Sequence, residues 1–81
     1  MNRLNHKSLD LHGSSHDDAE VFIDEFIIRN IEKLPLEIIT GNSVRMLEVL
    51  RNVVLKHKLK LIPSHASNMG SYLVTMPLYI D

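Results

Sequence analysis

The sequence predicts a two-layer α/β sandwich: a mixed four-stranded sheet with two helices on one face, in the order β-α-β-α-β-β. Two amphipathic stretches, residues 15–34 and 44–57, alternate with short apolar segments rich in Leu, Ile and Val. Because right-handed helical crossovers join parallel strands, the first three strands should be parallel, and a short last connection makes the fourth antiparallel. Two helices cover one face of such a sheet, so we expect the other face to be open.

The composition predicts one small globular domain. The chain has 81 residues, and we expect residues 1–7 to form an N-terminal arm and residues 8–81 the domain. Hydrophobic residues make up 44% and charged residues 23%, and the net charge is −1. The absence of cysteine excludes disulfides and thiol catalysis and fits a cytoplasmic location. We expect neither a signal peptide nor a membrane partner, because no apolar run is long enough.

The first strand, predicted over residues 7–12, carries the most informative polar pair. Residues 9–13 are Leu-Asp-Leu-His-Gly. Alternation along a strand sends the two leucines to one face and Asp10 and His12 to the other, and Gly13 allows a sharp turn directly afterwards. An acid and an imidazole at a strand end suit a catalytic or ligand-binding pair. The other interpretation is the polar outer face of a half-exposed strand.

The first helix is predicted between a capping serine and a proline. Ser15 is followed three positions later by an acidic residue, which is similar to a capping box. The helix should end near Leu34, because the residue before Pro35 avoids helical angles. Phe22 and Phe26 lie at helical spacing on its apolar side, and we expect both rings to fill the core.

The middle of the chain predicts a strand, a turn and a second helix. Residues 36–40 are short, β-branched and followed by the turn residues 41–42. Ser43 is a good N-cap for a helix over residues 44–57. The basic residues 56–58 lie at its C-terminal end, where we expect solvated charge favoured by the helix dipole.

The last third predicts two strands joined by a loop. The third strand starts at Lys60, and Pro63 places this segment at a sheet edge or a strand end because proline donates no ladder hydrogen bond. Residues 64–70 are mostly small and polar and are expected to form the loop. The fourth strand is predicted over residues 71–76.

Three segments are expected to meet at one rim of the sheet. Parallel strands end on the same side, which brings together residues 12–16, 40–43 and 65–70. Open α/β sheets bind ligands beyond the carboxyl ends of their strands. Free N–H groups after Ser43 and the side chain of Arg45 suit a phosphate group. The spacing therefore predicts a phosphodiester site better than an apolar one.

These segments resemble the Smr (small MutS-related) domain. The resemblance lies in residues 9–13 with the acidic helix start at 17–20, in Ile-Ile-Thr-Gly-Asn-Ser at 38–43, and in residues 68–74. It implies a fold like the C-terminal domain of translation initiation factor three. It also implies nucleic-acid binding and, in many members, endonuclease activity on DNA or RNA. For this chain we favour RNA over structured DNA, cleaved by hydrolysis or transesterification.

The resemblance and the rim together name the expected site residues. The family's Asp-any-His pair is tied to cleavage and carries over to Asp10 and His12. The family's glycine loop is tied to nucleic-acid contact, and here Ser43 replaces its second glycine. The expected nucleic-acid or phosphate-binding residues are Gly13, Thr40, Gly41, Asn42, Ser43, Arg45, His65 and Asn68.

The expected chemistry starts from the 2′-OH of RNA. His12 would remove its proton as general base, because imidazoles exchange protons near neutral pH, and Asp10 would support the ring. Backbone donors at residues 41–43 and Arg45 would stabilise charge on the phosphate, and His65 is a candidate general acid. No cofactor is expected; a divalent metal at Asp10, His12 and His65 is an option that the chemistry does not require. The alternatives are a domain that binds nucleic acid or a translation-related partner without cleavage, and a protein-interaction module that uses the open sheet face or the fourth strand.

Overall fold

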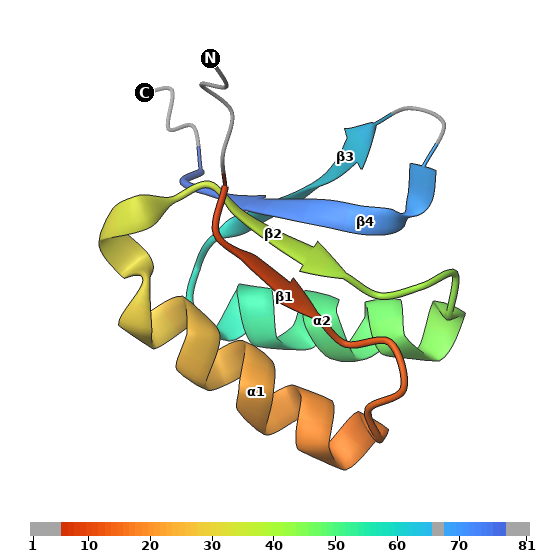
Figure 1. Cartoon of the computed structure of the whole chain (residues 1–81). Coiled ribbons are helices and arrows are strands. Elements are labelled where there is room, and N and C mark those ends of the chain that lie inside the picture. The colour runs from red at the N-terminus through yellow and green to blue at the C-terminus, as the bar shows by residue number, and fades with distance from the viewer. Residues whose placement is uncertain (1–5, 66–67, 78–81) are drawn as a thin grey trace.

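The protein is a four-stranded sheet with both helices against one face (Figure 1). The computed structural model describes residues 6–65 and 68–77, without the side chains of residues 65, 68 and 69. The element order confirms the predicted α/β sandwich. The elements are β1 (Ser8–Asp10), α1 (His16–Arg29), β2 (Leu36–Ile39), α2 (Val44–Lys56), β3 (Lys60–His65) and β4 (Asn68–Thr75).

The strand order in the sheet is β1-β2-β4-β3. β1 pairs parallel to β2, and β4 pairs antiparallel to both β2 and β3. The first three strands therefore run in the same direction, as predicted. Because β4 lies between β2 and β3, the end of β2 is next to the start of β4, and the end of β3 is one strand further away.

β1 is shorter than the predicted strand over residues 7–12. Leu11 still bonds to β2, its N–H donating to the Ile39 carbonyl oxygen at 2.8 Å. The Ser14 N–H then donates to the Leu11 carbonyl oxygen at 2.9 Å and closes a turn in which Gly13 has a φ of +86°. His12 lies in this turn and not on the strand, so strand alternation does not determine where its side chain points.

α1 begins where the sequence predicts and ends earlier. The Ser15 side chain caps the helix, accepting a hydrogen bond from the Asp18 N–H at 3.1 Å. The helix stops before Asn30, whose side-chain amide and backbone N–H donate to the Phe26 carbonyl oxygen at 2.8 and 3.1 Å. A single 3₁₀ turn, Ile31–Lys33, follows. The predicted continuation of the helix toward the proline is wrong because the asparagine ends it first.

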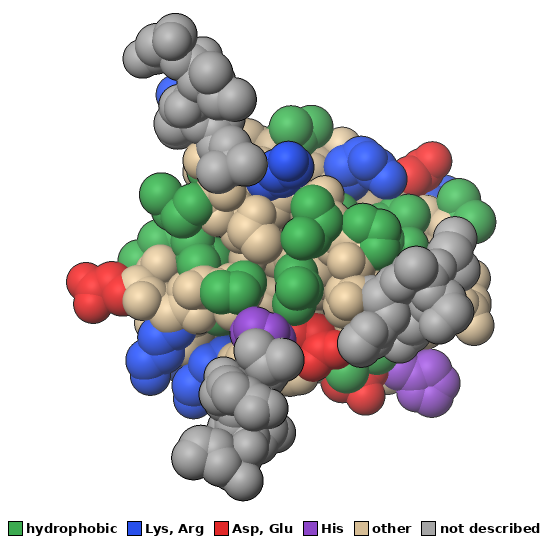
Figure 2. All heavy atoms as spheres, turned by 90° about the horizontal axis from the view of Figure 1, so that it is seen from above, with side chains coloured by type: hydrophobic (Ala, Val, Ile, Leu, Met, Phe, Trp, Pro, Cys, Tyr) green, Lys and Arg blue, Asp and Glu red, His purple; other side chains and the backbone are tan. Residues whose placement is uncertain are grey.

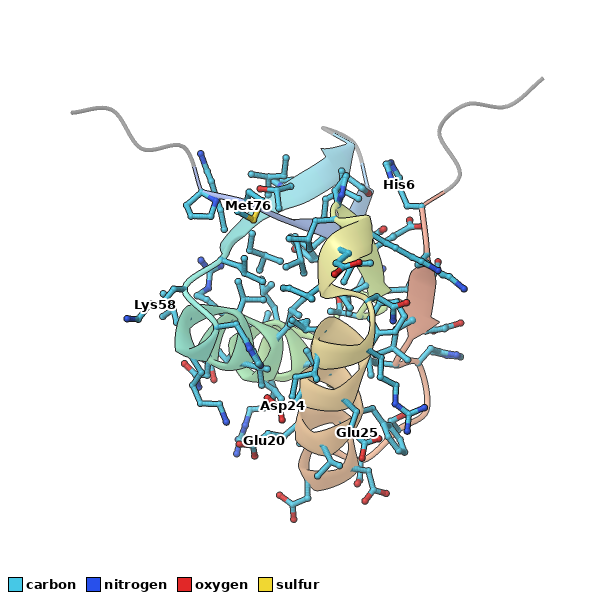
Figure 3. The ribbon with its side chains drawn as sticks, turned by 90° about the vertical axis from the view of Figure 1, so that its left-hand side faces the viewer. His6, Glu20, Asp24, Glu25, Lys58 and Met76 are labelled. Atoms are coloured by element: carbon cyan, nitrogen blue, oxygen red, sulfur yellow. The ribbon has the colours of Figure 1, made fainter. Side chains whose placement is uncertain are left out.

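α2 confirms its predicted start and corrects the expectation for its end. The Ser43 hydroxyl caps the helix, accepting from the Met46 N–H at 3.0 Å. His57, expected to be solvated, instead bonds across to α1, with its Nε2 2.7 Å from Asp24 Oδ1. Figure 3 shows Asp24 on the side of α1 that faces α2. Packing of the two helices therefore gives this helix-end histidine a partner that α2 alone could not supply.

The core fills the space between the helices and the sheet. Phe26 is half-buried and packs against the core, but Phe22 is 45% exposed. The prediction that Phe22 fills the core is wrong, because the buried stripe of α1 passes along the neighbouring Ile23. The buried hydrophobic residues are Leu11, Ala19, Ile23, Ile27, Leu36, Ile38, Met46, Leu50, Val53, Val54, Tyr72 and Val74.

The β3–β4 hairpin has a shorter connection than predicted. The sequence predicts a loop over residues 64–70, but β3 extends to His65 and β4 begins at Asn68. Gly70 therefore lies in a strand. Pro63 lies in an edge strand, as predicted, beside a shift in register.

Candidate functional site

The loop after β2 is bonded to the start of β4. The N–H groups of Thr40 and Gly41 donate to the Gly70 carbonyl oxygen at 2.8 and 3.2 Å, and the Thr40 hydroxyl donates to the same oxygen at 3.3 Å. Thr40 is 4% exposed. Two of the expected phosphate contacts thus hold the loop in place: the Thr40 hydroxyl and the Gly41 N–H are both occupied within the fold.

The imidazole of His12 lies against this loop. A Cβ built on Gly41 would be 3.6 Å from His12 Cδ2, which is ordinary van der Waals contact. Gly41 has a φ of +70° and Asn42 a φ of +47°, so the loop bends sharply here. His12 is exposed. The structure therefore brings all three predicted segments to one rim: Gly70 bonds to the loop after β2, and the imidazole of the turn after β1 lies beside Gly41.

Asp10 acts on the backbone of the turn. Its Oδ1 accepts a hydrogen bond from the His12 N–H at 2.9 Å. An aspartate that bonds the backbone two residues ahead stabilises a turn. In the part of the chain that the structure describes, the Asp10 carboxylate makes no hydrogen bond to the imidazole. The geometry thus assigns Asp10 to the turn that carries His12.

A shallow pocket opens beside the N-terminus of α2. Because Ser43 caps the Met46 N–H, the N–H groups of the two preceding helical residues, Val44 and Arg45, have no partner within the helix. The Arg45 side chain is exposed. The pocket has a volume of about 230 Å³ and is lined by Asn42, Ser43, Val44, Leu47 and Tyr72.

The third predicted segment contributes the Gly70 carbonyl oxygen to the rim. His65 and Asn68 pair through their backbones at the end of the β3–β4 hairpin, and their side chains lie outside the described residues. The general acid and the metal trio that involve His65 therefore stay predictions. Among the side chains that the structure does describe, no group of three His, Asp or Glu could hold a metal ion.

The sheet face opposite the helices has an apolar centre. Ile39, Ile62 and Leu73 are half-buried there, and Figure 2 looks onto this face and shows hydrophobic side chains gathered on it. Beside them the Glu37 carboxylate accepts hydrogen bonds from the hydroxyls of Ser8 (3.2 Å) and Ser71 (2.7 Å). The face thus combines an apolar centre with one fixed carboxylate.

Gly70, Leu47 and Tyr72 are the site residues that sequence reasoning missed. Gly70 holds the loop, and the other two line the pocket at the start of α2. No local pattern could reveal the role of Gly70, because it depends on β4 pairing next to β2. The helical stripe of α2 does signal Leu47, although as a core residue.

Fold and site together define a two-layer α/β domain with a candidate ligand-binding rim at its strand ends. Comparisons of the chain with protein-family models, curated proteins and solved structures give no match. Within residues 6–65 and 68–77, neither helix has the length and apolar character needed to cross a membrane.

Proposed function

We propose that this chain is a small cytoplasmic nucleic-acid-binding domain of the Smr-like type, which holds an RNA phosphodiester at the rim and cleaves it with His12. The observation that carries the proposal is the closeness of the His12 ring to Gly41, where an added Cβ would lie 3.6 Å from His12 Cδ2. It puts an exposed imidazole beside the loop that leads into α2, a helix whose first turn has free backbone N–H groups and the exposed Arg45. Helix N-termini and arginine favour anions, so this combination suits a phosphodiester.

The chemistry that follows is transesterification. His12 would accept the proton of the ribose 2′-OH, and the 2′-oxygen would attack the adjacent phosphorus. The bond from phosphorus to the 5′-oxygen breaks, which gives a 2′,3′-cyclic phosphate, and the leaving oxygen takes up a proton from an acid or from water. The N–H groups of Val44 and Arg45 would stabilise negative charge on the non-bridging oxygens. RNA is favoured because DNA lacks the 2′-OH nucleophile.

Asp10 is a positioning residue in this scheme. Its carboxylate bonds the His12 N–H and not the ring, so it fixes the turn and thereby the place of the imidazole beside Gly41.

The experiment that tests cleavage compares two histidine variants. Purified protein is incubated with structured RNAs and branched DNAs, with and without a chelator. His12→Ala should lower RNA cleavage at least about 100-fold, the usual contribution of a general base, while RNA binding is kept. His16→Ala, which removes another exposed imidazole at the start of α1, is the matched control and should keep both. Cleavage that survives in His12→Ala would refute the catalytic assignment.

Binding is tested by its dependence on salt. Affinity should fall as salt rises, because phosphate contacts release counterions, and Arg45→Gln should reduce the slope of log K against log salt by about 1. Arg51→Gln, an exposed arginine later in α2, is the control and should leave the slope unchanged. Salt-sensitive binding without cleavage would leave a nucleic-acid-binding domain that does not cut. Binding that ignores salt would contradict phosphate recognition.

A second candidate function is protein binding through the open sheet face. Its apolar centre of Ile39, Ile62 and Leu73 favours this candidate, since apolar patches of this kind mark interaction sites. Leu73→Lys should then abolish partner binding and leave RNA binding intact. Arg45→Gln should weaken RNA binding and leave partner binding intact.

A further inference from the structure

The two edges of the sheet differ in their protection against strand pairing. The β3 edge carries Lys60, Pro63 and a register shift after Pro63, all of which hinder the addition of another strand. The β1 edge carries neither lysine nor proline within Ser8–Asp10. Its one charged side chain, Asp10, is bonded to the backbone of the following turn. β1 is therefore the edge that is open to pairing.

The backbone of β1 has donors and acceptors directed away from the sheet. Lys7 and Leu11 bond to the backbone of β2, each at 2.8 Å. In a parallel ladder the alternate residues, here Ser8 and Asp10, direct their N–H and C=O groups to the opposite side. No described element lies on that side, because β1 is the outermost strand.

An apolar groove with charged rims runs beside this edge. It lies between β1 and α1, and Phe22 at its mouth is 45% exposed. Glu25 and Arg29 form its charged part, and neither has an ion-pair partner among the described residues. Figure 3 shows Glu25 on the side of α1 away from Asp24. The groove has a volume of about 210 Å³ and is lined by Leu9, Phe22, Glu25, Phe26 and Arg29.

We propose that this surface, the β1 edge with its groove, pairs with the same surface of a second copy of the chain. The two β1 strands would run antiparallel about a two-fold axis at Leu9. Ser8 of each copy then lies opposite Asp10 of the other, and each such pair exchanges two backbone hydrogen bonds. The two sheets become one continuous sheet.

The charges of the groove favour a second copy over an unrelated strand. The same two-fold axis makes the two α1 helices antiparallel. In an interface of this symmetry, each contact between a residue of one copy and a residue of the other occurs twice, once in each direction. Glu25 of each copy can thereby face Arg29 of the other, while the Phe22 rings cover the apolar groove. The surface is therefore self-complementary: each copy offers a strand edge, an apolar side chain, an anion and a cation, and each of these meets its counterpart on the other copy.

The dimer should be weak and independent of the rim. β1 has three residues, so the strand pairing is short, and small interfaces are typical of transient complexes. His12 lies in the turn beyond β1 and takes no part in the pairing.

Sedimentation velocity of the full chain from about 1 to 200 µM tests the proposal. We expect a monomer–dimer equilibrium in this range. Phe22→Glu should raise the dissociation constant at least about tenfold, as expected for an aromatic residue that becomes buried in an interface. Ile28→Glu, which is on the same helix and 57% exposed but does not line the groove, is the matched control and should leave the equilibrium unchanged.

Charge reversal gives a second, independent readout. Glu25→Arg and Arg29→Glu should each weaken the dimer, and the double variant should restore it because the pairs re-form across the two-fold axis. Ser8→Pro serves if Phe22→Glu fails to fold, since it removes an outward N–H and leaves the β1–β2 bonds in place. A monomer throughout the range would overturn the proposal. An extended peptide of another protein would then be the candidate that pairs with the β1 edge. A dimer that Phe22→Glu and Ile28→Glu affect equally would overturn it too.

Discussion

Replacing Gly70 by alanine should displace the loop after β2 and lower the stability of the domain. A Cβ on Gly70 would lie 3.2 Å from the Asn42 nitrogen and 3.4 Å from Gly41 Cα. Both atoms belong to backbone, which cannot rotate away as a flexible side chain can. The Gly41–Asn42 loop must therefore move by a few tenths of an ångström, and the three hydrogen bonds that the Gly70 carbonyl oxygen accepts will weaken.

The magnitude follows from this contact. Gly70 is not among the residues with positive φ, so the cost comes from crowding and not from backbone strain. Forcing an extra methyl group into a well-packed site costs about 1–3 kcal/mol, and we expect about 2 kcal/mol for Gly70→Ala. For a domain of this size, that lowers the melting temperature by about 10 °C. RNA affinity should fall as well, because the moved loop carries the contact with His12.

Urea unfolding followed by circular dichroism measures the free energy of unfolding, and Gly13→Ala is the control. Gly13 has a φ of +86°, and a methyl group added to it would meet no atom within 4 Å, so its substitution costs only left-handed strain, about 1 kcal/mol. A Gly70→Ala variant as stable as the unmodified chain, or more stable than Gly13→Ala, would show that β4 does not close on the loop as described.

Three further sets of substitutions probe the turn, the helix contact and the helix cap. Asp10→Ala should cost about 1 kcal/mol of unfolding free energy and lower RNA cleavage. Asp10→Asn keeps an acceptor for the His12 N–H and should therefore keep the stability and the cleavage of the unmodified chain. Loss of cleavage in Asp10→Asn would show that the charge itself is needed. Asp24→Ala and His57→Ala should each lower the unfolding free energy by no more than about 1 kcal/mol. The double variant should lose less than the sum of the two, because both single variants lose the same hydrogen bond. Additive losses would contradict the contact. Ser43→Ala should lower the unfolding free energy by about 1 kcal/mol, but Ser43→Gly by only a few tenths of a kcal/mol. Thermal unfolding measures this difference, and equal losses in the two variants would contradict the cap.

The features that the sequence predicts correctly are local ones. Ser15 and Ser43 cap the two helices as expected, because a cap needs only a hydroxyl and an N–H three residues later. The apolar stripe of α2 follows from helical spacing alone. The element order, and with it the direction of each strand, follows from the alternation of these patterns along the chain.

The site itself illustrates what tertiary structure adds. The sequence names Asp10 and His12 as a pair on one strand face, but the carboxylate bonds the backbone and the imidazole lies beside Gly41. Strand alternation could not show this, because β1 ends before His12 and a turn takes over. The contact of His12 depends on β2 lying beside β1, which is a relation between residues about thirty positions apart.

The sequence alone was enough to predict the order of the helices and strands, where the helices begin, and that β1 to β3 run in one direction. The tertiary structure alone decided that β4 lies between β2 and β3, that Gly70 holds the loop, and that Phe22 is left exposed beside an open edge. The physical reason is that periodicity reports only which side of each element is apolar. Which apolar sides pack together, and in what order, is set by the free energy of the whole chain.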